Sequence, residues 1–522
     1  MAPLAKDASS GDEIGNGREE GNSQLRFLII GAGSRGASYA AAIQRSGLAV
    51  VAGVVEPVPF KRQLLGSQHI WQETGTSKPH QEFDDWKDYI TFERQRRRDA
   101  VAGLPVPPGM DGVFVCVRDG LHAPVVNDLA PLGLHTMCEK PLATSLSDCL
   151  SIQRTLNAQP EPRIFAIGHV LRYSPHNMLL RHLLLGEKVV GEVLSMEHTE
   201  PIGYWHFSHS YVRGQWRKET TSAPSLLTKS CHDVDFILWM LCSTIPEGSQ
   251  ASIHLPSSVG SVGSLKQFRR SMKPREAGSA TNCLSCPVRD TCLYSAPKIY
   301  YDKHLEQDIT KWPIDVVNLE VPGILEDQGK EAARSALFAT LAEDYDAAST
   351  PAQDIEDRSW YGRCVWESDN DVCDDQTVTF TWEDDPAVDR GAKTAIFHMI
   401  AQTLAQCERR GRIYGTTGEI SYDSQSITVH DFKSGETNTH KPEVPVNSHH
   451  GGGDDGLTQC FLDAVKAVKE GTMDVSEAQR YYMGCTLEDM IRSHAAVFAA
   501  EEARREKKII SWKEWWERNV VT

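Results

Sequence analysis

The sequence lacks the features that would direct a protein to a membrane or to nucleic acid. No apolar run approaches the roughly 18–20 residues needed to span a bilayer. Basic residues are in deficit, because 54 Lys and Arg face 71 Asp and Glu, giving a formal net charge of −17. An acidic surface is repelled by phosphate backbones and by anionic headgroups. We therefore expect neither a membrane nor a nucleic acid as the partner.

No secretory signal peptide is visible in the sequence. The first 24 residues are rich in Gly, Ser, Asp, Glu and Asn and contain no apolar core, so we predict a disordered tail over residues 1–24. Thirteen cysteines are spread over 522 residues without secretory context. We read them as mostly reduced thiols and expect a cytoplasmic protein. The length allows two or three domains.

Regular structure is predicted to begin at Leu25. The run Leu25–Ile30 is short and apolar, which is typical of a strand buried on both faces. It leads into Gly31-Ala32-Gly33-Ser34-Arg35-Gly36 and then into an Ala-rich helical stretch. Further strands are expected over 49–55, 113–117 and 134–138, alternating with helical segments. This order predicts an α/β unit, a Rossmann domain with a parallel sheet over residues 25–164.

The pattern changes after about residue 165. Residues 376–382 alternate apolar and Thr side chains, residues 193–198 alternate in the same way, and residues 413–420 contain a hairpin-like Gly-Thr-Thr-Gly turn. Alternation of this kind predicts a mostly antiparallel sheet with one covered face. We therefore predict an α+β domain over residues 165–522 with an open sheet. It would contain a low-periodicity insertion over 250–350, a flexible break over 449–456 and C-terminal helices from Leu457, one of them capped by Ser476 and Gln479.

The glycine loop predicts a dinucleotide site because of its context, directly after a buried strand and at the start of a helix. Gly31 permits the tight turn, Gly33 lets the backbone approach a pyrophosphate, and Gly36 lets helix and strand pack closely. The helix N-terminus, with Ser34 and Arg35, offers N–H donors to the phosphates. The alternative is a glycine-rich turn without a ligand.

Glu56 ends the next strand, 20 positions after Gly36. A carboxylate there accepts hydrogen bonds from ribose hydroxyls and repels a 2′-phosphate, which favours NAD. Arg35 and Arg62 leave NADP open, because either guanidinium could pair with that phosphate.

A second pattern joins the segment Cys138-Glu139-Lys140-Pro141-Leu142-Ala143 to a histidine, His232. Alone, neither is informative. The glycine loop lies about 100 residues before the Glu139-Lys140-Pro141 segment, and His232 lies about 90 residues after that segment. With this combination the chain resembles the glucose-fructose oxidoreductase / inositol dehydrogenase / MocA family, from about Leu25 to Glu514.

Three further segments carry the resemblance: residues 115–122, 168–173 and 229–235. Two positions depart from the family pattern. Arg118 stands where the family usually has Thr-Pro, and Thr228 stands where many members have an Asp four residues before the histidine. Lys229, Asp233 and Asp235 remain open as replacements for that Asp. The form Lys-Ser-Cys-His-Asp resembles a fungal-type subgroup of the family.

The resemblance implies hydride transfer between a nicotinamide and a sugar, cyclitol or related hydroxyl compound. His232 would act as the base and Lys140 would stabilise the developing alkoxide. The resemblance also implies cofactor contacts by His122, Glu139 and Lys140, substrate contacts and a homodimer or homotetramer. The substrate contacts suggested are Arg172, Tyr173, His206 and Asp235.

Two other functions stay open for this kind of chain. Some relatives use bound NAD for transient oxidation and elimination, and so cleave a glycosidic bond without net redox change. Another relative is a regulator that binds nucleotide without turnover. The retained Lys140 and His232 weigh against the second alternative.

Three cysteines inside the predicted insertion show a non-random spacing. Cys283, Cys286 and Cys292 form C-x2-C-x5-C, and paired thiolates can bind zinc, which takes four ligands in structural sites. Cys231, beside His232, is the candidate for the fourth. A redox-sensitive dithiol and inert buried thiols are the alternatives.

Overall fold

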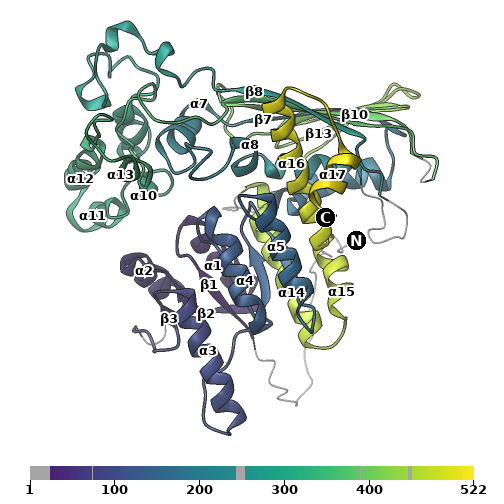
Figure 1. Ribbon diagram of the computed structural model, residues 1–522, viewed down its shortest axis with the longest axis horizontal. Coiled ribbons are helices and arrows are strands. Elements are labelled where there is room, and N and C mark those ends of the chain that lie inside the picture. The colour runs from purple at the N-terminus through teal and green to yellow at the C-terminus, as the bar shows by residue number, and fades with distance from the viewer. Residues whose placement is uncertain (1–23, 73–74, 243–252, 388–389, 445–449, 522) are drawn as a thin grey trace.

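The computed structural model describes residues 24–72, 75–242, 253–387, 390–444 and 450–521, and it contains two sheets (Figure 1). The predicted tail over 1–24 lies outside the described residues except for its last residue. Among the helices of the described ranges, none combines the length and the apolar character needed to cross a membrane.

The first sheet is the predicted parallel one. Its six strands run in the order β3-β2-β1-β4-β5-β6, and every pairing is parallel. The strands are β1 (Leu25–Ile30), β2 (Ala49–Val55), β3 (Glu82–Phe83), β4 (Gly112–Val115), β5 (His135–Cys138) and β6 (Phe165–Ile167). Helices α1 (Ser34–Ser46), α2 (Pro59–His69), α3 (Trp86–Val101), α4 (His122–Leu129) and α5 (Leu146–Asn157) connect them. Because β6 completes this sheet, the first domain extends past the predicted boundary at residue 164.

The second sheet has nine strands in the order β14-β13-β12-β11-β7-β10-β9-β8-β15. Only β7 and β10 pair in parallel among the described strands of this sheet, so the predicted mostly antiparallel sheet is confirmed. Helices α9 (Cys231–Leu241) and α16 (Leu487–Glu506) pack on one face. The strands are β7 (Val193–Pro201), β8 (Ser258–Ser264), β9 (Asp375–Trp382), β10 (Lys393–Ile400), β11 (Arg410–Gly415), β12 (Gly418–Tyr422), β13 (Ile427–Asp431), β14 (Thr437–His440) and β15 (Ile510–Ser511).

A long excursion leaves this sheet between β8 and β9. It contains short 3-10 turns and helices α10 (Ile314–Val317), α11 (Val321–Gln328), α12 (Lys330–Ala342) and α13 (Ala352–Glu356). It encloses a small apolar core of its own, around Tyr300, Ile314 and Leu337. The predicted insertion began at 250, because the Ser- and Gly-rich sequence of β8 shows no apolar alternation. In the structure that segment is a strand, and the excursion spans residues 265–374.

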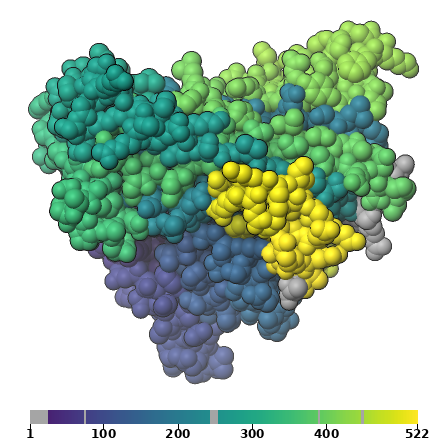
Figure 2. Space-filling model, turned by 45° about the horizontal axis from the view of Figure 1, so that its top comes forward, coloured from purple at the N-terminus to yellow at the C-terminus, as the bar shows by residue number. Residues whose placement is uncertain are grey.

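The C-terminal helices return to the first domain. Helix α14 (Gly453–Lys469) packs against α1, and its Phe461 ring contacts Phe27 of β1 and Phe114 of β4. Helix α16 bridges the domains by contacting both α5 and α9. Figure 2 shows the last segment on the surface near the junction of the two domains. Trp512 and Trp515 of α17 (Trp512–Asn519) are buried.

Two local predictions in this region are wrong. Helix α15 (Val475–Ala478) is capped by Asp474, whose side chain accepts the N–H of Glu477, so Ser476 and Gln479 form no capping box. The predicted break over 449–456 includes the first turn of α14, which begins at Gly453. Residue 449 lies outside the described residues.

Candidate functional site

The glycine loop has the geometry that its spacing predicts. Gly31 has φ +96°, and a Cβ there would lie 2.5 Å from the carbonyl oxygen of Cys116. A Cβ on Gly36 would lie 2.0 Å from the carbonyl oxygen of Gly31. By contrast, a Cβ on Gly33 would meet nothing within 4 Å. The first and third glycines therefore serve packing, and the second borders open space.

The loop offers backbone N–H groups that no side chain caps, and the carboxylate of Glu56 lies beside it. No side chain caps the N-terminus of α1, where Ser34 is the first residue. Glu56, buried at the end of β2, accepts the N–H groups of Ala32 and Val58, each at 2.9 Å. Open space at Gly33, free helix N–H groups and a carboxylate after β2 fit the pyrophosphate and ribose of a dinucleotide.

Arg35 is half-buried and held by two carboxylates. Its guanidinium binds Glu139 at 2.7 Å and both carboxylate oxygens of Asp454 at 3.0 Å. The two carboxylates outweigh the effect of burial and raise the pKa of Arg35 well above its usual value. The other basic candidate, Arg62, is also paired, with Glu82 and Asp84. As the side chains stand, neither arginine is free for a 2′-phosphate.

His122 and Glu139 hold the loops that follow β4 and β5. The ring nitrogens of His122 lie 2.6 Å from the carbonyl oxygen of Pro141 and 3.1 Å from that of Val117. Glu139 accepts the N–H of Lys140 at 3.0 Å. Both side chains are buried, so the structure places these two predicted cofactor contacts beneath the loop surface.

Lys140 reaches from the first domain to the end of helix α8 in the second. Its ammonium donates to the backbone carbonyl of Thr228 at 2.7 Å and lies 6.0 Å from the ring centre of Trp216. Helix α8 (Ser225–Thr228) ends at this carbonyl. Thr228, which stands where many family members have an Asp, thus accepts a hydrogen bond from Lys140 through its backbone oxygen.

His232 lies in the first turn of α9 and is only 6% exposed. Its Nδ1 is buried and has no hydrogen-bond partner among the described residues. Burial, and then the charges of Lys140 and His169, lower the pKa of His232 well below its usual value. The ring is therefore neutral near pH 7 and can accept a proton.

None of the three open replacements for the missing Asp contacts His232. Asp235 forms a two-pronged pair with Arg172, each bond 2.7 Å long. Asp233 binds Arg409 at 2.6 Å and the ring of His198 at 2.9 Å. The third, Lys229, lies 3.3 Å from Glu200 and 3.0 Å from the sulfur of Cys407.

The suggested substrate contacts divide into two groups. Arg172 and Asp235 form hydrogen bonds with each other. The hydroxyl of Tyr173 donates to the carbonyl of Met483 at 2.9 Å. The polar groups of these three side chains are therefore bonded within the protein. His206, in α7 (Tyr204–Phe207), is half-buried. Its ring nitrogen lies 3.5 Å from the sulfur of Cys407. Burial lowers the pKa of His206 well below its usual value, and the charges of Lys229, Lys140 and His450 lower it further, so His206 lies near the proposed catalytic residues.

Sequence reasoning missed His450. Its ring centre lies 6.4 Å from that of His232. The sequence shows only a His- and Gly-rich stretch there, and nothing in that composition signals a return to the site. It is the packing of α14 against α1 that brings His450 there.

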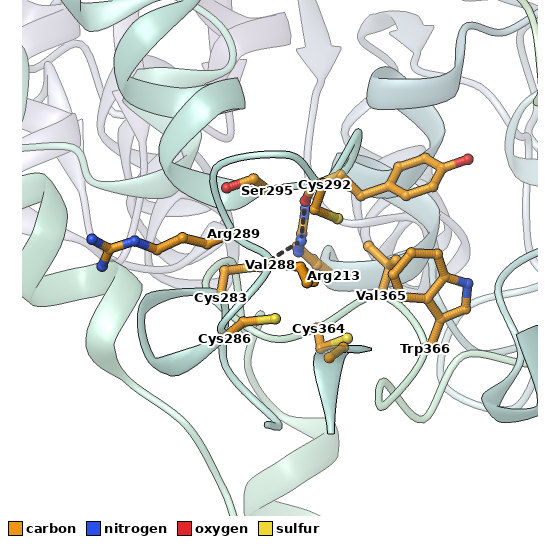
Figure 3. Close-up of a pocket in the computed structure, with 12 residues that line it drawn as sticks. Arg213, Cys283, Cys286, Val288, Arg289, Cys292, Ser295, Cys364, Val365 and Trp366 are labelled. Atoms are coloured by element: carbon orange, nitrogen blue, oxygen red, sulfur yellow. Dashed lines mark hydrogen bonds between the residues drawn. The ribbon is translucent and has the colours of Figure 1, made fainter. Parts of the chain in front are cut away.

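The cysteine cluster differs from the prediction in its fourth member. Cys283, Cys286, Cys292 and Cys364 line one small cavity (Figure 3), whereas Cys231 lies in α9 beside Lys140. The guanidinium of Arg213 enters this cavity and donates to the sulfur of Cys283 at 3.4 Å.

The zinc prediction has no support from this cluster. Within the described ranges, no group of three or more His, Cys, Asp or Glu side chains is arranged to hold a metal ion. Burial also raises the pKa of Cys292, and it raises the pKa of Cys364 to about 11. A raised pKa disfavours the thiolate that a metal requires.

The first domain is similar to known proteins in sequence. Residues 25–166 match an oxidoreductase family described by its NAD-binding Rossmann fold, GFO/IDH/MocA. Similar curated proteins include an inositol 2-dehydrogenase of Gluconacetobacter diazotrophicus, 32% identical over 145 residues, which are 27% of this chain and 39% of that protein. A 2,7-anhydro-N-acetylneuraminate hydratase of Escherichia coli is 30% identical over 139 residues, 26% of this chain and 35% of that protein. The chain thus spans little more than a third of the length of these relatives.

The likeness in fold extends over nearly the whole chain. A levoglucosan dehydrogenase solved with NADH and levoglucosan aligns over 94% of this chain and 99% of its own, with a TM-score of 0.57 and 13% identity. An oxidoreductase from Agrobacterium radiobacter solved with NAD+, L-tartaric acid and magnesium covers the same 94% and 98% of its own chain, with a TM-score of 0.55 and 12% identity. Each of these solved structures therefore covers both domains of the chain. The family match is thus confined to residues 25–166, which resemble the NAD-binding domain of the GFO/IDH/MocA oxidoreductases.

Proposed function

We propose that the protein is an NAD-dependent dehydrogenase that oxidises a CH–OH group of a sugar, cyclitol or related hydroxyl compound. The observation that carries the proposal is that the ammonium of Lys140 bonds the carbonyl of Thr228 across the domain junction and lies close enough to the buried, neutral His232 for its charge to lower the pKa of that ring. A cation and a neutral base are the two groups that alcohol oxidation requires from a protein.

Different residues of the chain bind the cofactor, accept the proton and stabilise the substrate oxygen. The loop at Gly33, the N-terminus of α1 and Glu56 would hold the dinucleotide, which when bound accepts the hydride from the substrate carbon. His232 accepts the hydroxyl proton, since its lowered pKa keeps the ring neutral near pH 7. The Lys140 ammonium donates a hydrogen bond to the substrate oxygen as negative charge develops there.

NAD, rather than NADP, is the proposed cofactor. Glu56 stands where a 2′-phosphate would have to lie, and its carboxylate repels that group. Arg35 and Arg62, the two arginines that could have favoured the phosphate, are each paired with two carboxylates.

The substrate class rests on the surroundings of Lys140 and on the relatives. Half-buried Trp216, whose ring centre lies 6.0 Å from the Lys140 ammonium, provides an aromatic face of the kind that packs against the C–H groups of sugars. Inositol and levoglucosan, the substrates named for two similar proteins, are polyhydroxylated rings.

The test is to incubate the purified protein with NAD or NADP and a panel of sugars and cyclitols, and to follow absorbance at 340 nm. We expect NADH to accumulate with at least one polyhydroxylated ring. Lys140→Met should retain cofactor binding and lose turnover. A Lys140→Met variant as active as the wild type would contradict the proposal.

A second candidate function is elimination and re-addition with transient oxidation. The hydratase from Escherichia coli, 30% identical over the matched residues, favours it. The two functions differ in one measurement. A dehydrogenase accumulates NADH in proportion to product, whereas a hydratase or glycosidase of this kind returns its hydride in each cycle and forms product at constant absorbance.

We also propose a cytoplasmic homodimer or homotetramer formed through the outer face of the nine-stranded sheet. Val262 and Ile396 point outward from β8 and β10 and are 79% and 40% exposed. Exposed apolar side chains on a sheet face are typical of subunit contacts. Light scattering of the wild type and of Val262→Lys should show loss of the oligomer in the variant.

A further inference from the structure

His450 stands between the buried base and solvent. Its ring centre is 6.4 Å from that of His232, a separation that a single water molecule can bridge. The His450 side chain is 40% exposed, whereas His232 is 6% exposed. The two imidazoles thus form a pair with one member inside the site and the other at its surface.

The backbone and one carboxylate fix the orientation of His450. His450, Gly451 and Gly452 have φ values of +50°, +62° and +85°, and a positive φ is uncommon for histidine. Both carboxylate oxygens of Asp454, one turn into α14, lie 3.2 Å from Nδ1 of His450. In the neutral ring this contact places the proton on Nδ1 and leaves the lone pair of Nε2 available.

The oxidation proposed above produces a proton that His232 cannot keep. Burial and the charges of Lys140, His169 and Arg409 all disfavour a cationic His232. Its Nδ1 has no partner among the described residues that could take the proton directly. Of the charged or titratable neighbours, Lys140 and Arg409 are already cationic, and His169 is 2% exposed.

We propose that His450 relays the substrate proton from His232 to solvent. The inference rests on the proposed dehydrogenase function. The proton leaves the substrate hydroxyl for His232, passes through a bridging water to Nε2 of His450, and is released from His450 to bulk water. The hydride leaves the same substrate on the nicotinamide, so each turnover yields one oxidised product, one NADH and one free proton.

Asp454 supports the transient charge and links the relay to the cofactor loop. Its carboxylate faces His450 on one side and Arg35 of α1 on the other. Burial lowers the pKa of His450, Asp454 raises it, and the charges of Arg35 and Lys229 lower it further. His232 and His206 face the same space from α9 and α7 and also respond to the charge of His450. A lowered pKa suits a group that must release its proton at neutral pH.

The test is chemical rescue of His450→Ala with imidazole in the full-length protein. We expect kcat to fall by about 10–100-fold in dilute, non-nitrogenous buffer. Added imidazole should restore kcat in a saturable way, because it replaces the missing acceptor. The affinity for NAD and the KM for substrate should stay within twofold of the wild type, and circular dichroism should report an unchanged fold.

His182→Ala is the matched control. His182 is 41% exposed and lies 3.2 Å from the carboxylate of Glu187, so it resembles His450 in exposure and pairing but lies on a surface helix away from His232. We expect no loss of kcat and no response to imidazole.

The remaining outcomes are also decisive. A His450→Ala protein with wild-type kcat, or with a loss that imidazole does not repair, overturns the relay. If His450→Ala folds poorly, His450→Gln must show the same rescue. A wild type that forms product without NADH, or none at all, instead overturns the dehydrogenase function on which the relay rests.

Discussion

Lys140 and Thr228 are joined by a hydrogen bond of 2.7 Å from the lysine ammonium to the threonine backbone carbonyl. The resemblance to the family leads one to expect a carboxylate side chain at Thr228. Here a neutral oxygen takes its place next to the lysine, and no described carboxylate contacts His232. Among the described residues, neither the proposed cation, Lys140, nor the proposed base, His232, therefore has a direct counter-ion.

Replacing Lys140 tests the role of that cation. Lys140→Met keeps the length and the apolar stem of the side chain but removes the charge. We expect kcat/KM to fall by about 100–1,000-fold, the range found when one donor to a developing oxyanion is removed. The affinity for NAD, measured by calorimetry, should change little because the dinucleotide loop is untouched. Lys87→Met, an exposed lysine of α3, is the control and should leave kcat/KM unchanged.

The pH dependence of kcat/KM should reflect the lowered pKa of His232. A base must be neutral to act, so activity is lost as pH falls through its pKa. Because that pKa lies well below its usual value of 6.5, activity should persist at pH 6 and its acidic limb should lie below 6.5. A limb at or above pH 6.5 would contradict this account. The profile of kcat/KM from pH 4.5 to 9 decides the matter.

Glu56 should decide the choice of cofactor. In Glu56→Ser the carboxylate that faces the ribose is removed, while the hydroxyl still can accept the N–H of Ala32. We expect the preference for NAD over NADP to fall by at least about tenfold, equivalent to about 1.4 kcal/mol. The measurement is the ratio of the kcat/KM values for the two cofactors. Arg62 lies nearby, and Glu82→Gln, which weakens its pairing, should increase the gain for NADP.

The pair of Arg172 and Asp235 distinguishes a structural from a substrate-binding role. Both side chains are buried and bond each other twice. Asp235→Asn leaves the guanidinium without its counter-charge, so we expect the free energy of unfolding to fall by about 3–5 kcal/mol. The double variant Arg172→Met, Asp235→Leu should recover much of that loss. A change in KM without a change in stability would instead restore the substrate role.

Local patterns predicted the first domain and most of the second sheet, while contacts between distant segments remained hidden. The features of the dinucleotide loop lie within a short stretch of sequence, from Leu25 to Glu56. Their arrangement could therefore be predicted from local patterns. His122 and Glu139 were predicted as cofactor contacts, but both side chains are buried, because the loops after β4 and β5 fold over them. Asp454, which binds Arg35 from 419 positions away, has no local signal.

The cysteine cluster shows the same limit. The spacing of Cys283, Cys286 and Cys292 predicted that they would lie together, and they do. The fourth sulfur comes from Cys364, more than seventy positions later, and not from Cys231. Arg213, from a third segment, fills the space among them, which spacing alone could not reveal.

Arg213 should be the residue on which this cluster depends for its stability. It is 1% exposed, and its guanidinium bonds the carbonyls of Arg363 and Tyr294, each at 2.7 Å, besides the sulfur of Cys283. Arg213→Leu leaves two buried carbonyls without donors and detaches the excursion from the second domain, so we expect a loss of about 3–5 kcal/mol in the free energy of unfolding. The buried thiols of Cys283 and Cys364 should then react faster with a thiol reagent. Arg289→Leu, whose side chain is 50% exposed on the same loop, should change neither quantity. If Arg213→Leu unfolds like the wild type, the guanidinium does not join the excursion to the sheet.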